Sequence, residues 1–166
     1  MPMHKLQPIR IAPVDATVRQ ALLGLGVRPR QRDCVGAIAD LLADAASCPG
    51  CEPMAILHGD TPVGYYRIDA NARSVAGRDF DLPALGLRAF FIDAAWQGRG
   101  LGAQALAALI ADLAERHRQA RLLVLAVASG NRPALRLYGR AGFVDSGALY
   151  HGGRSGPQQL LRRDLP

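Results

Sequence analysis

The chain has 166 residues, of which 49% are hydrophobic and 20% charged, and its formal net charge at pH 7 is +6. This length suits one domain, residues 1–166, with a sizeable core, and the composition excludes an intrinsically disordered chain. The basic residues are nearly all arginines scattered along the sequence. A nucleic-acid-binding protein would gather them in a stripe interleaved with aromatic residues, so we predict no nucleic-acid partner.

The N-terminal residues lead into no apolar stretch typical of a signal peptide. No apolar run approaches the ~20 residues needed to cross a bilayer. We therefore expect a cytoplasmic protein with no membrane partner. The cysteines Cys34, Cys48 and Cys51 are odd in number, which argues against a disulfide framework.

The first half of the sequence predicts two helices and a β-hairpin after an edge strand. Residues 8–12 form the strand, Asp15 caps the first helix, and the second helix runs from Asp33 to about Ala46. Residues 54–69 predict two short strands joined at Gly59-Asp60, which is the best hairpin signal in the chain. Residues 70–83 are polar and irregular, and we expect a loop there.

The second half predicts a repeated strand and helix pattern. The continuous apolar run 122–127 is typical of a central strand that is covered on both faces. The other elements are strand 85–92, helix 101–117, a helix from Asn131 to Ala141, and strands 143–149 and 158–165. The order predicts an α+β fold with a single mixed, mostly antiparallel sheet and helices on both faces.

The helix that starts at Leu101 follows the segment WQGRGLG and has no carboxylate between Gln97 and Ala111. A helix N-terminus carries unpaired N–H groups and a partial positive charge. Glycines let a bulky anion approach those N–H groups closely. The segment therefore predicts a phosphate or pyrophosphate site; the alternative is a loop that merely allows tight strand-to-helix packing.

Two common phosphate motifs fit this segment poorly. A P-loop needs Lys and Ser or Thr after its last glycine, whereas Ala103 and Gln104 follow Gly102. Gly98, Gly100 and Ala103 match the dinucleotide fingerprint, but the next strand ends without the acidic residue that binds ribose. A nucleotide-binding oxidoreductase is therefore a weak alternative.

A third motif extends well beyond the glycines. Residues 97–103 resemble the Q/R-x-x-G-x-G/A signature of the GCN5-related N-acetyltransferase (GNAT) superfamily. Downstream, the N-x-x-A-x-x-x-Y-x-x-x-G-F spacing typical of that family is met by Asn131, Ala134, Tyr138, Gly142 and Phe143. The resemblance covers about residues 84–145. It implies an acetyl-CoA-dependent N-acetyltransferase in which a primary amine, of a small molecule or a protein, attacks the thioester directly.

The resemblance also implies where the cofactor would bind. Acetyl-CoA would lie in a V-shaped gap between strands 85–92 and 122–127, with its pantetheine arm along the backbone of Phe90 and Ile92. Asn131 would cap its helix and contact the same arm. The pyrophosphate would bind the N–H groups of Gly98, Arg99, Gly100, Leu101, Gly102 and Ala103.

Tyr138 is the expected catalytic residue. A phenol near the thioester sulfur can protonate the departing thiolate as a general acid. The alternative is a tyrosine packed in the core with its hydroxyl satisfied. No residue stands out as the general base: Asp93, His58, His151 and a water chain remain open, and Asp93 could instead cap its loop. A non-catalytic acyl-CoA-binding sensor of the same fold is therefore the main alternative function.

Several other residues have more than one interpretation. Cys48 and Cys51 form a C-x-x-C pair that could join Cys34 and His58 around zinc or act in redox chemistry. We instead predict ordinary loop thiols and no metal. Trp96 is expected to be a hydrophobic plug beneath the glycine segment.

The acceptor side is the least defined by the sequence. Arg67 and Arg88 could hold a substrate carboxylate or could be solvated charges at the sheet edge. Tyr65 and Tyr66 alternate faces on one strand, so one of them is expected to line the cleft. In this fold the loops 25–33, 70–83 and 150–157 would determine which acceptor binds. Their composition indicates no particular substrate. A homodimer is possible.

Overall fold

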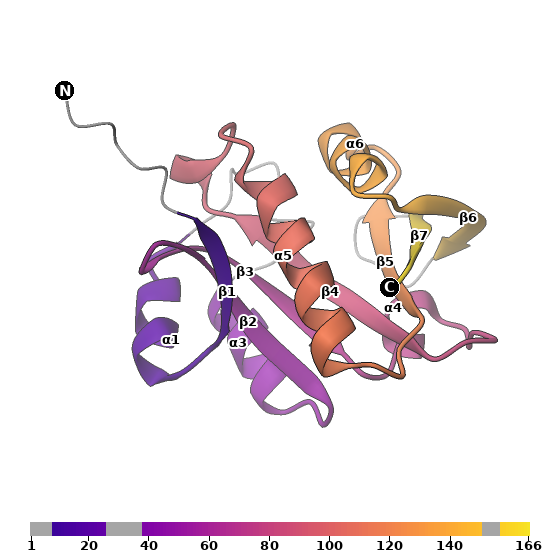
Figure 1. Ribbon diagram of the computed structural model, residues 1–166, viewed down its shortest axis with the longest axis horizontal. Coiled ribbons are helices and arrows are strands. Elements are labelled where there is room, and N and C mark those ends of the chain that lie inside the picture. Colours follow the sequence, from indigo (N-terminus) through magenta and orange to yellow (C-terminus); the bar gives the residue numbers. More distant parts are fainter. Residues whose placement is uncertain (1–7, 26–37, 151–156) are drawn as a thin grey trace.

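Seven strands form one mixed sheet in the order β1-β2-β3-β4-β5-β7-β6, in a computed structural model that describes residues 8–25, 38–150 and 157–166 (Figure 1). Among these residues, β4 and β5 are the one parallel pair of neighbours, and the other pairs are antiparallel. This confirms the predicted α+β fold. The strands are β1 (Ile9–Pro13), β2 (Cys51–His58), β3 (Thr61–Asp69), β4 (Ala84–Ile92), β5 (Leu122–Ala128), β6 (Val144–Tyr150) and β7 (Gln158–Asp164).

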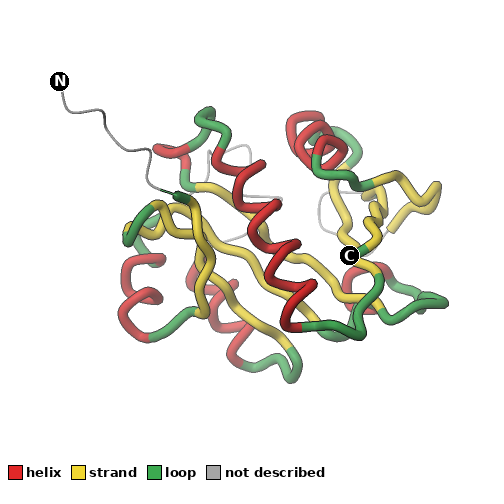
Figure 2. Tube along the Cα trace, viewed as in Figure 1, coloured by secondary structure: helices red, strands yellow, loops and turns green. Residues whose placement is uncertain are grey.

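Helices cover both faces of the sheet. On one face α5 crosses the strands diagonally, and it shares an apolar cluster with α6 (Figure 2). On the other face α1 and α3 pack over a second cluster. The helices are α1 (Ala16–Leu22), α3 (Ile38–Ala46), α4 (Arg73–Ala76), η2 (a 3₁₀ turn, Ala94–Trp96), α5 (Leu101–Arg116) and α6 (Arg132–Arg140).

Most of the predicted elements are confirmed, because local signals fix them. The Asp15 carboxylate accepts a hydrogen bond of 2.8 Å from the Val18 N–H and caps α1. The predicted hairpin is β2–β3, and the apolar run is the buried strand β5. The predicted cap Asp33 lies outside the described residues.

The segment 70–83 is not entirely a loop, so that prediction is wrong in part. It contains the short helix α4, in which Val75 and Ala76 are buried. A helix of four residues is too short to show apolar periodicity, and its contacts with β4 and β5 stabilise it instead.

A bulge in β4 decides which side chains face α5. Ala89 has a positive φ of 56°, and the β3–β4 register shifts beside it. Before Ala89, Leu85 and Leu87 belong to the cluster beneath α5; after it, Phe90 and Ile92 pack there. Without the extra residue, the alternation of the strand would direct Phe90 to the opposite face.

The parallel strands β4 and β5 separate soon after they begin. Their pairing covers only Ala84 with Leu122, Leu85 with Leu123 and Gly86 with Val124. Beyond Gly86, β4 therefore has a backbone edge that β5 does not cover. The two splayed strands predicted from the sequence are confirmed. None of the helices in the described ranges is both long and apolar enough to cross a bilayer.

Charged side chains join the C-terminal end of α5 to β2. Arg116 lies 3.1 Å from one oxygen of Glu52, and the His117 ring lies 3.1 Å from the other. Burial alone would raise the pKa of Glu52, but the hydrogen bonds and positive charges of Arg116 and His117 outweigh it and lower this pKa.

We predict that Glu52→Gln lowers the free energy of unfolding at pH 7 by less than about 1 kcal/mol, because the pair is partly exposed. A lowered pKa means that the ionised carboxylate stabilises the fold above its unfolded pKa and loses this effect as the pH falls through the folded pKa. Urea unfolding from pH 7 to pH 3 should show that the free energies of unfolding of the variant and the wild type become equal at pH values below the usual pKa range of a carboxyl group. A constant difference would contradict the assignment.

Candidate active site

The glycine segment forms an open turn that ends in the first residue of α5. Gly98 and Gly100 have positive φ values of 78° and 75°, and Gly100 is the N-cap of the helix. A Cβ atom added at either position would meet nothing within 4 Å. Glycine is required here by the backbone conformation, and the N–H groups of the first turn remain open to a ligand.

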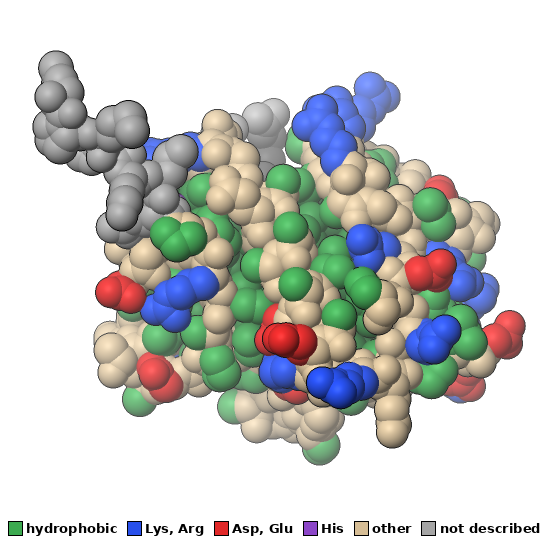
Figure 3. Space-filling view, viewed as in Figure 1, with side chains coloured by type: hydrophobic (Ala, Val, Ile, Leu, Met, Phe, Trp, Pro, Cys, Tyr) green, Lys and Arg blue, Asp and Glu red, His purple; other side chains and the backbone are tan. Residues whose placement is uncertain are grey.

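A groove of about 350 Å³ lies beside this turn, between β4, α5 and α6. Figure 3 shows hydrophobic side chains between α5 and α6 in the middle of this face. The sequence-predicted residues that line the groove are Phe90, Ile92, Gly98, Gly100, Leu101, Gly102, Ala103, Asn131 and Tyr138. The groove therefore brings together the part of β4 that β5 does not cover and the open N-terminus of α5.

Arg99 is the predicted site residue whose side chain turns away from the groove. Its guanidinium lies over the Trp96 ring, 4.9 Å from the ring centre, and donates to the Ala95 carbonyl at 3.3 Å. Trp96 packs against the core, as expected of a plug, and also lines the groove. The indole therefore supports both the turn and the groove wall.

Two side chains fix the connection between β4 and the glycine turn. Gln97 donates from Nε2 to the Ile92 carbonyl at 2.8 Å. The Asp93 carboxylate accepts from the Ala95 N–H at 3.2 Å and caps η2. Of the two roles that the sequence left open for Asp93, the structure supports the capping role.

Tyr138 lies in an aromatic setting at the inner wall of the groove. Its ring makes edge contacts with Phe90, at 6.2 Å between ring centres, and with Phe143, at 5.6 Å. Burial raises the pKa of the Tyr138 phenol, which keeps its proton at neutral pH. Asn131 caps the same helix through a hydrogen bond of 3.4 Å from the Ala134 N–H.

Three arginines on α6 were not predicted from the sequence. Arg132, Arg136 and Arg140 recur every four residues and so share one side of the helix. All three are exposed, Arg140 lines the groove, and Lys and Arg side chains gather over α6 in Figure 3. Their spacing of four residues is visible in the sequence and indicates a helix face that attracts anions.

Other predicted site residues lie elsewhere. Tyr65 and Tyr66 do point to opposite clusters, but both are fully buried and neither lines the groove, so that prediction is wrong. The His58 ring packs against Trp96 in a tilted arrangement, with 5.1 Å between the ring centres. His151 lies outside the described residues. A second hollow, of about 860 Å³, lies at the opposite end of β4 and β5.

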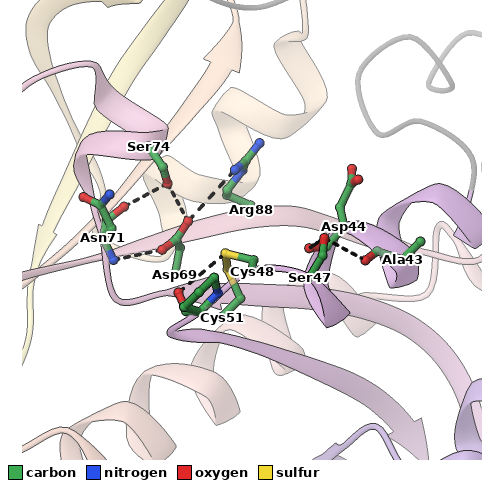
Figure 4. The surroundings of a disulfide bond; sticks show 10 residues. Ala43, Asp44, Ser47, Cys48, Cys51, Asp69, Asn71, Ser74 and Arg88 are labelled. Atoms are coloured by element: carbon green, nitrogen blue, oxygen red, sulfur yellow. Dashed lines mark hydrogen bonds and ion pairs between the residues drawn. A yellow bond between two sulfur atoms is a disulfide. The ribbon is translucent and has the colours of Figure 1, made fainter.

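Cys48 and Cys51 are joined by a disulfide, so the prediction of two free loop thiols is wrong (Figure 4). The turn after α3 brings their Cα atoms to 5.5 Å, within the range that a disulfide spans. The two sulfurs and a carboxylate oxygen of Asp69 lie within 4.8 Å of one another. Bonded sulfurs are not thiolate ligands, however, and Cys34 lies outside the described residues.

Comparison with known proteins identifies the family. The model of the acetyltransferase (GNAT) family matches residues 18–143. This chain belongs to that family. The GNAT chain is 33% identical over 145 residues to the spermine/spermidine N(1)-acetyltransferase of Bacillus subtilis strain 168, an alignment that covers 85% of this chain and 91% of the relative.

Solved structures share the fold of this GNAT protein. AAC(6′)-Ib in complex with paromomycin and acetyl-CoA superposes with a TM-score of 0.77 at 18% identity, over 95% of this chain and 93% of that one. A phosphinothricin N-acetyltransferase, so described provisionally, gives 0.68 at 15% identity, over 95% and 99% of the two chains. The chain is an N-acetyltransferase that uses acetyl-CoA as co-substrate.

We predict that Gly100→Ala destabilises this GNAT protein by about 1–2 kcal/mol, because a Cβ atom disfavours the left-handed backbone at that N-cap. Gly130→Ala is the matched control: its added Cβ also meets nothing within 4 Å, but its φ is not positive. Urea unfolding measures both. Equal stability of the two variants would contradict the argument.

Proposed function

We propose that acetyl-CoA binds in the groove beside the glycine turn, with its reactive end in the gap between β4 and β5. The observation that carries this proposal is that the open N-terminus of α5 and the uncovered edge of β4 meet in one groove. The N–H groups proposed to hold the pyrophosphate are those of Gly98, Arg99, Gly100, Leu101, Gly102 and Ala103.

The pantetheine arm would extend along β4. The backbone groups of Phe90 and Ile92 lie beyond Gly86, where the pairing with β5 has ended, so they can pair with the amides of the arm. On the opposite wall Asn131 caps α6 at the groove, and its amide is placed to contact the arm. Arg140 adds positive charge at the same wall and would attract a phosphate.

Tyr138 is proposed as the general acid of acetyl transfer. The neutral amine attacks the thioester carbonyl, a C–N bond forms, and the tetrahedral intermediate collapses by breaking the C–S bond. The Tyr138 phenol gives its proton to the departing thiolate, and the phenolate regains a proton as the ammonium nitrogen loses one through water. Because burial raises the pKa of this phenol, it is protonated before transfer.

A primary amine is the proposed acceptor. The Bacillus relative is described as acting on spermine and spermidine, and AAC(6′)-Ib is solved with an aminoglycoside, so amines are the shared chemistry. Loop 70–83 lies wholly within the described residues, whereas most of loops 25–33 and 150–157 lies outside them. We also propose a cytoplasmic location, where acetyl-CoA is available.

The first test is thermal unfolding with acetyl-CoA, with CoA and with NAD in separate samples. A ligand at 100 times its dissociation constant should stabilise the fold by about 2.7 kcal/mol and raise Tm by a few degrees. We expect shifts with both CoA compounds and none with NAD. A shift with NAD alone would contradict the proposed cofactor site.

A second test replaces the proposed acid. Tyr138→Phe should lower kcat for acetyl transfer by about 100-fold, a typical contribution of acid catalysis, while the Kd of acetyl-CoA stays within a factor of two or so. Tyr66→Phe is the matched control, since Tyr66 is buried, belongs to the same apolar cluster and does not line the groove. Unchanged turnover in Tyr138→Phe would rule out the general-acid role.

A further inference from the structure

Three buried side-chain atoms on β3 have no hydrogen-bond partner among the described residues: the hydroxyls of Tyr65 and Tyr66 and Nε of Arg67. Tyr66 belongs to the cluster beneath α5, whereas Tyr65 and Arg67, which are 0% and 5% exposed, lie on the opposite face. The two residues are separated by one position on the strand and so share a face. Most buried polar groups in proteins are hydrogen-bonded, so two adjacent unsatisfied donors require an explanation.

The charge of Arg67 is also uncompensated. No ion pair joins its guanidinium to a carboxylate in the described ranges. Directly opposite in the β3–β4 register lies a second arginine, Arg88. Figure 4 shows Arg88 directed toward the buried Asp69, whose carboxylate lies 4.0 Å from the Arg88 guanidinium. A buried cation without a partner is costly, and a bound anion would offset that cost.

These residues lie next to the groove. Tyr65 pairs with Phe91, which lines the groove, and Arg67 and Arg88 form the following row of the same strands. Phe91 and Tyr65 belong to the cluster on the face opposite α5. The parted strands thus connect the proposed cofactor groove to this row, and the 43% exposed side chain of Arg88 gives an anion a route to it from the surface.

The two donors remain donors at neutral pH. Burial raises the pKa of Tyr65 to about 12, although the positive charge of Arg67 lowers it. The protonated phenol can donate one hydrogen bond, the guanidinium has donors and no acceptor, and an arginine can bind both oxygens of a carboxylate.

We propose that Tyr65, Arg67 and Arg88 form a subsite for the carboxylate of the acyl acceptor, so that the acceptor is a small amino-carboxylate compound rather than a polyamine. This inference rests on the proposed acetyl transfer. Two cationic side chains at the subsite would repel a polycation and attract an amino acid or a related compound that carries both an amine and an anionic group.

The test compares amines that differ only in the carboxylate. Lysine is paired with cadaverine, and glutamate is paired with 4-aminobutyrate and with glutamate α-amide, both of which lack the α-carboxylate; spermidine is the polycation. Released CoA and acetylated product are measured at saturating acetyl-CoA. We expect kcat/KM to be at least about tenfold higher for the member of a pair that carries the extra α-carboxylate. Equal rates within the pairs, or faster transfer to spermidine, would overturn the proposal.

Arg67→Met separates a binding role from a structural one. It removes the buried charge with little change of volume, so Tm should be unchanged or higher, because an uncompensated buried charge is lost. The preference for the carboxylate should fall at least tenfold through KM, while KM for acetyl-CoA stays constant. Arg10→Met, at an exposed arginine on the edge strand β1, is the matched control. A retained preference for the carboxylate in the folded variant would overturn the proposal.

Failure of this inference differs from failure of the proposed function. If acetyl-CoA binds and the acetyl group is transferred equally well to amines that lack a carboxylate, only this inference is overturned. If acetyl-CoA does not bind and no acetyl transfer is measured, both the inference and the proposed function are overturned. If Arg67→Met does not fold, Tyr65→Phe removes one donor while keeping the ring, and its loss of preference tests the same subsite.

Discussion

The early separation of β4 and β5 is the constraint on which the site depends. Backbone groups in a sheet interior are normally satisfied by neighbouring strands, and a parallel pair is expected to continue along its length. Here the pairing stops at Gly86, and the Ala89 bulge directs the rest of β4 away while keeping Phe90 and Ile92 under α5. Apolar clusters beneath the helices on both faces pack against the strands on either side of this uncovered edge.

Positive charge accompanies this geometry on both faces of the sheet. The open N-terminus of α5, a first turn without acidic residues, and the arginines of α6 make one end of the groove suitable for phosphate groups. On the opposite face of the sheet, Arg67 and Arg88 give the neighbouring row a positive character. The Tyr138 phenol, in contrast, lies among aromatic rings where burial favours its neutral form.

Local signals made much of the fold predictable. Asp15 and Asn131 cap helices through hydrogen bonds to residues three positions on, so their effect is visible in a short stretch of sequence. Glycines 98 and 100 were predictable for the same reason, since their backbone conformation depends on the turn itself. The helix α4 and the burial of both Tyr65 and Tyr66 were not, because contacts with distant strands determine them.

The sequence by itself determined the element order, the family, and most of the residues that line the groove. Motif spacing follows helical and strand periodicity, which needs no knowledge of distant parts. Only the tertiary structure decided that Arg99 turns back onto Trp96, that Cys48 and Cys51 are bonded, and that Arg67 is buried opposite Arg88. These features depend on side-chain direction, burial and strand register, which arise when segments far apart in the chain pack together.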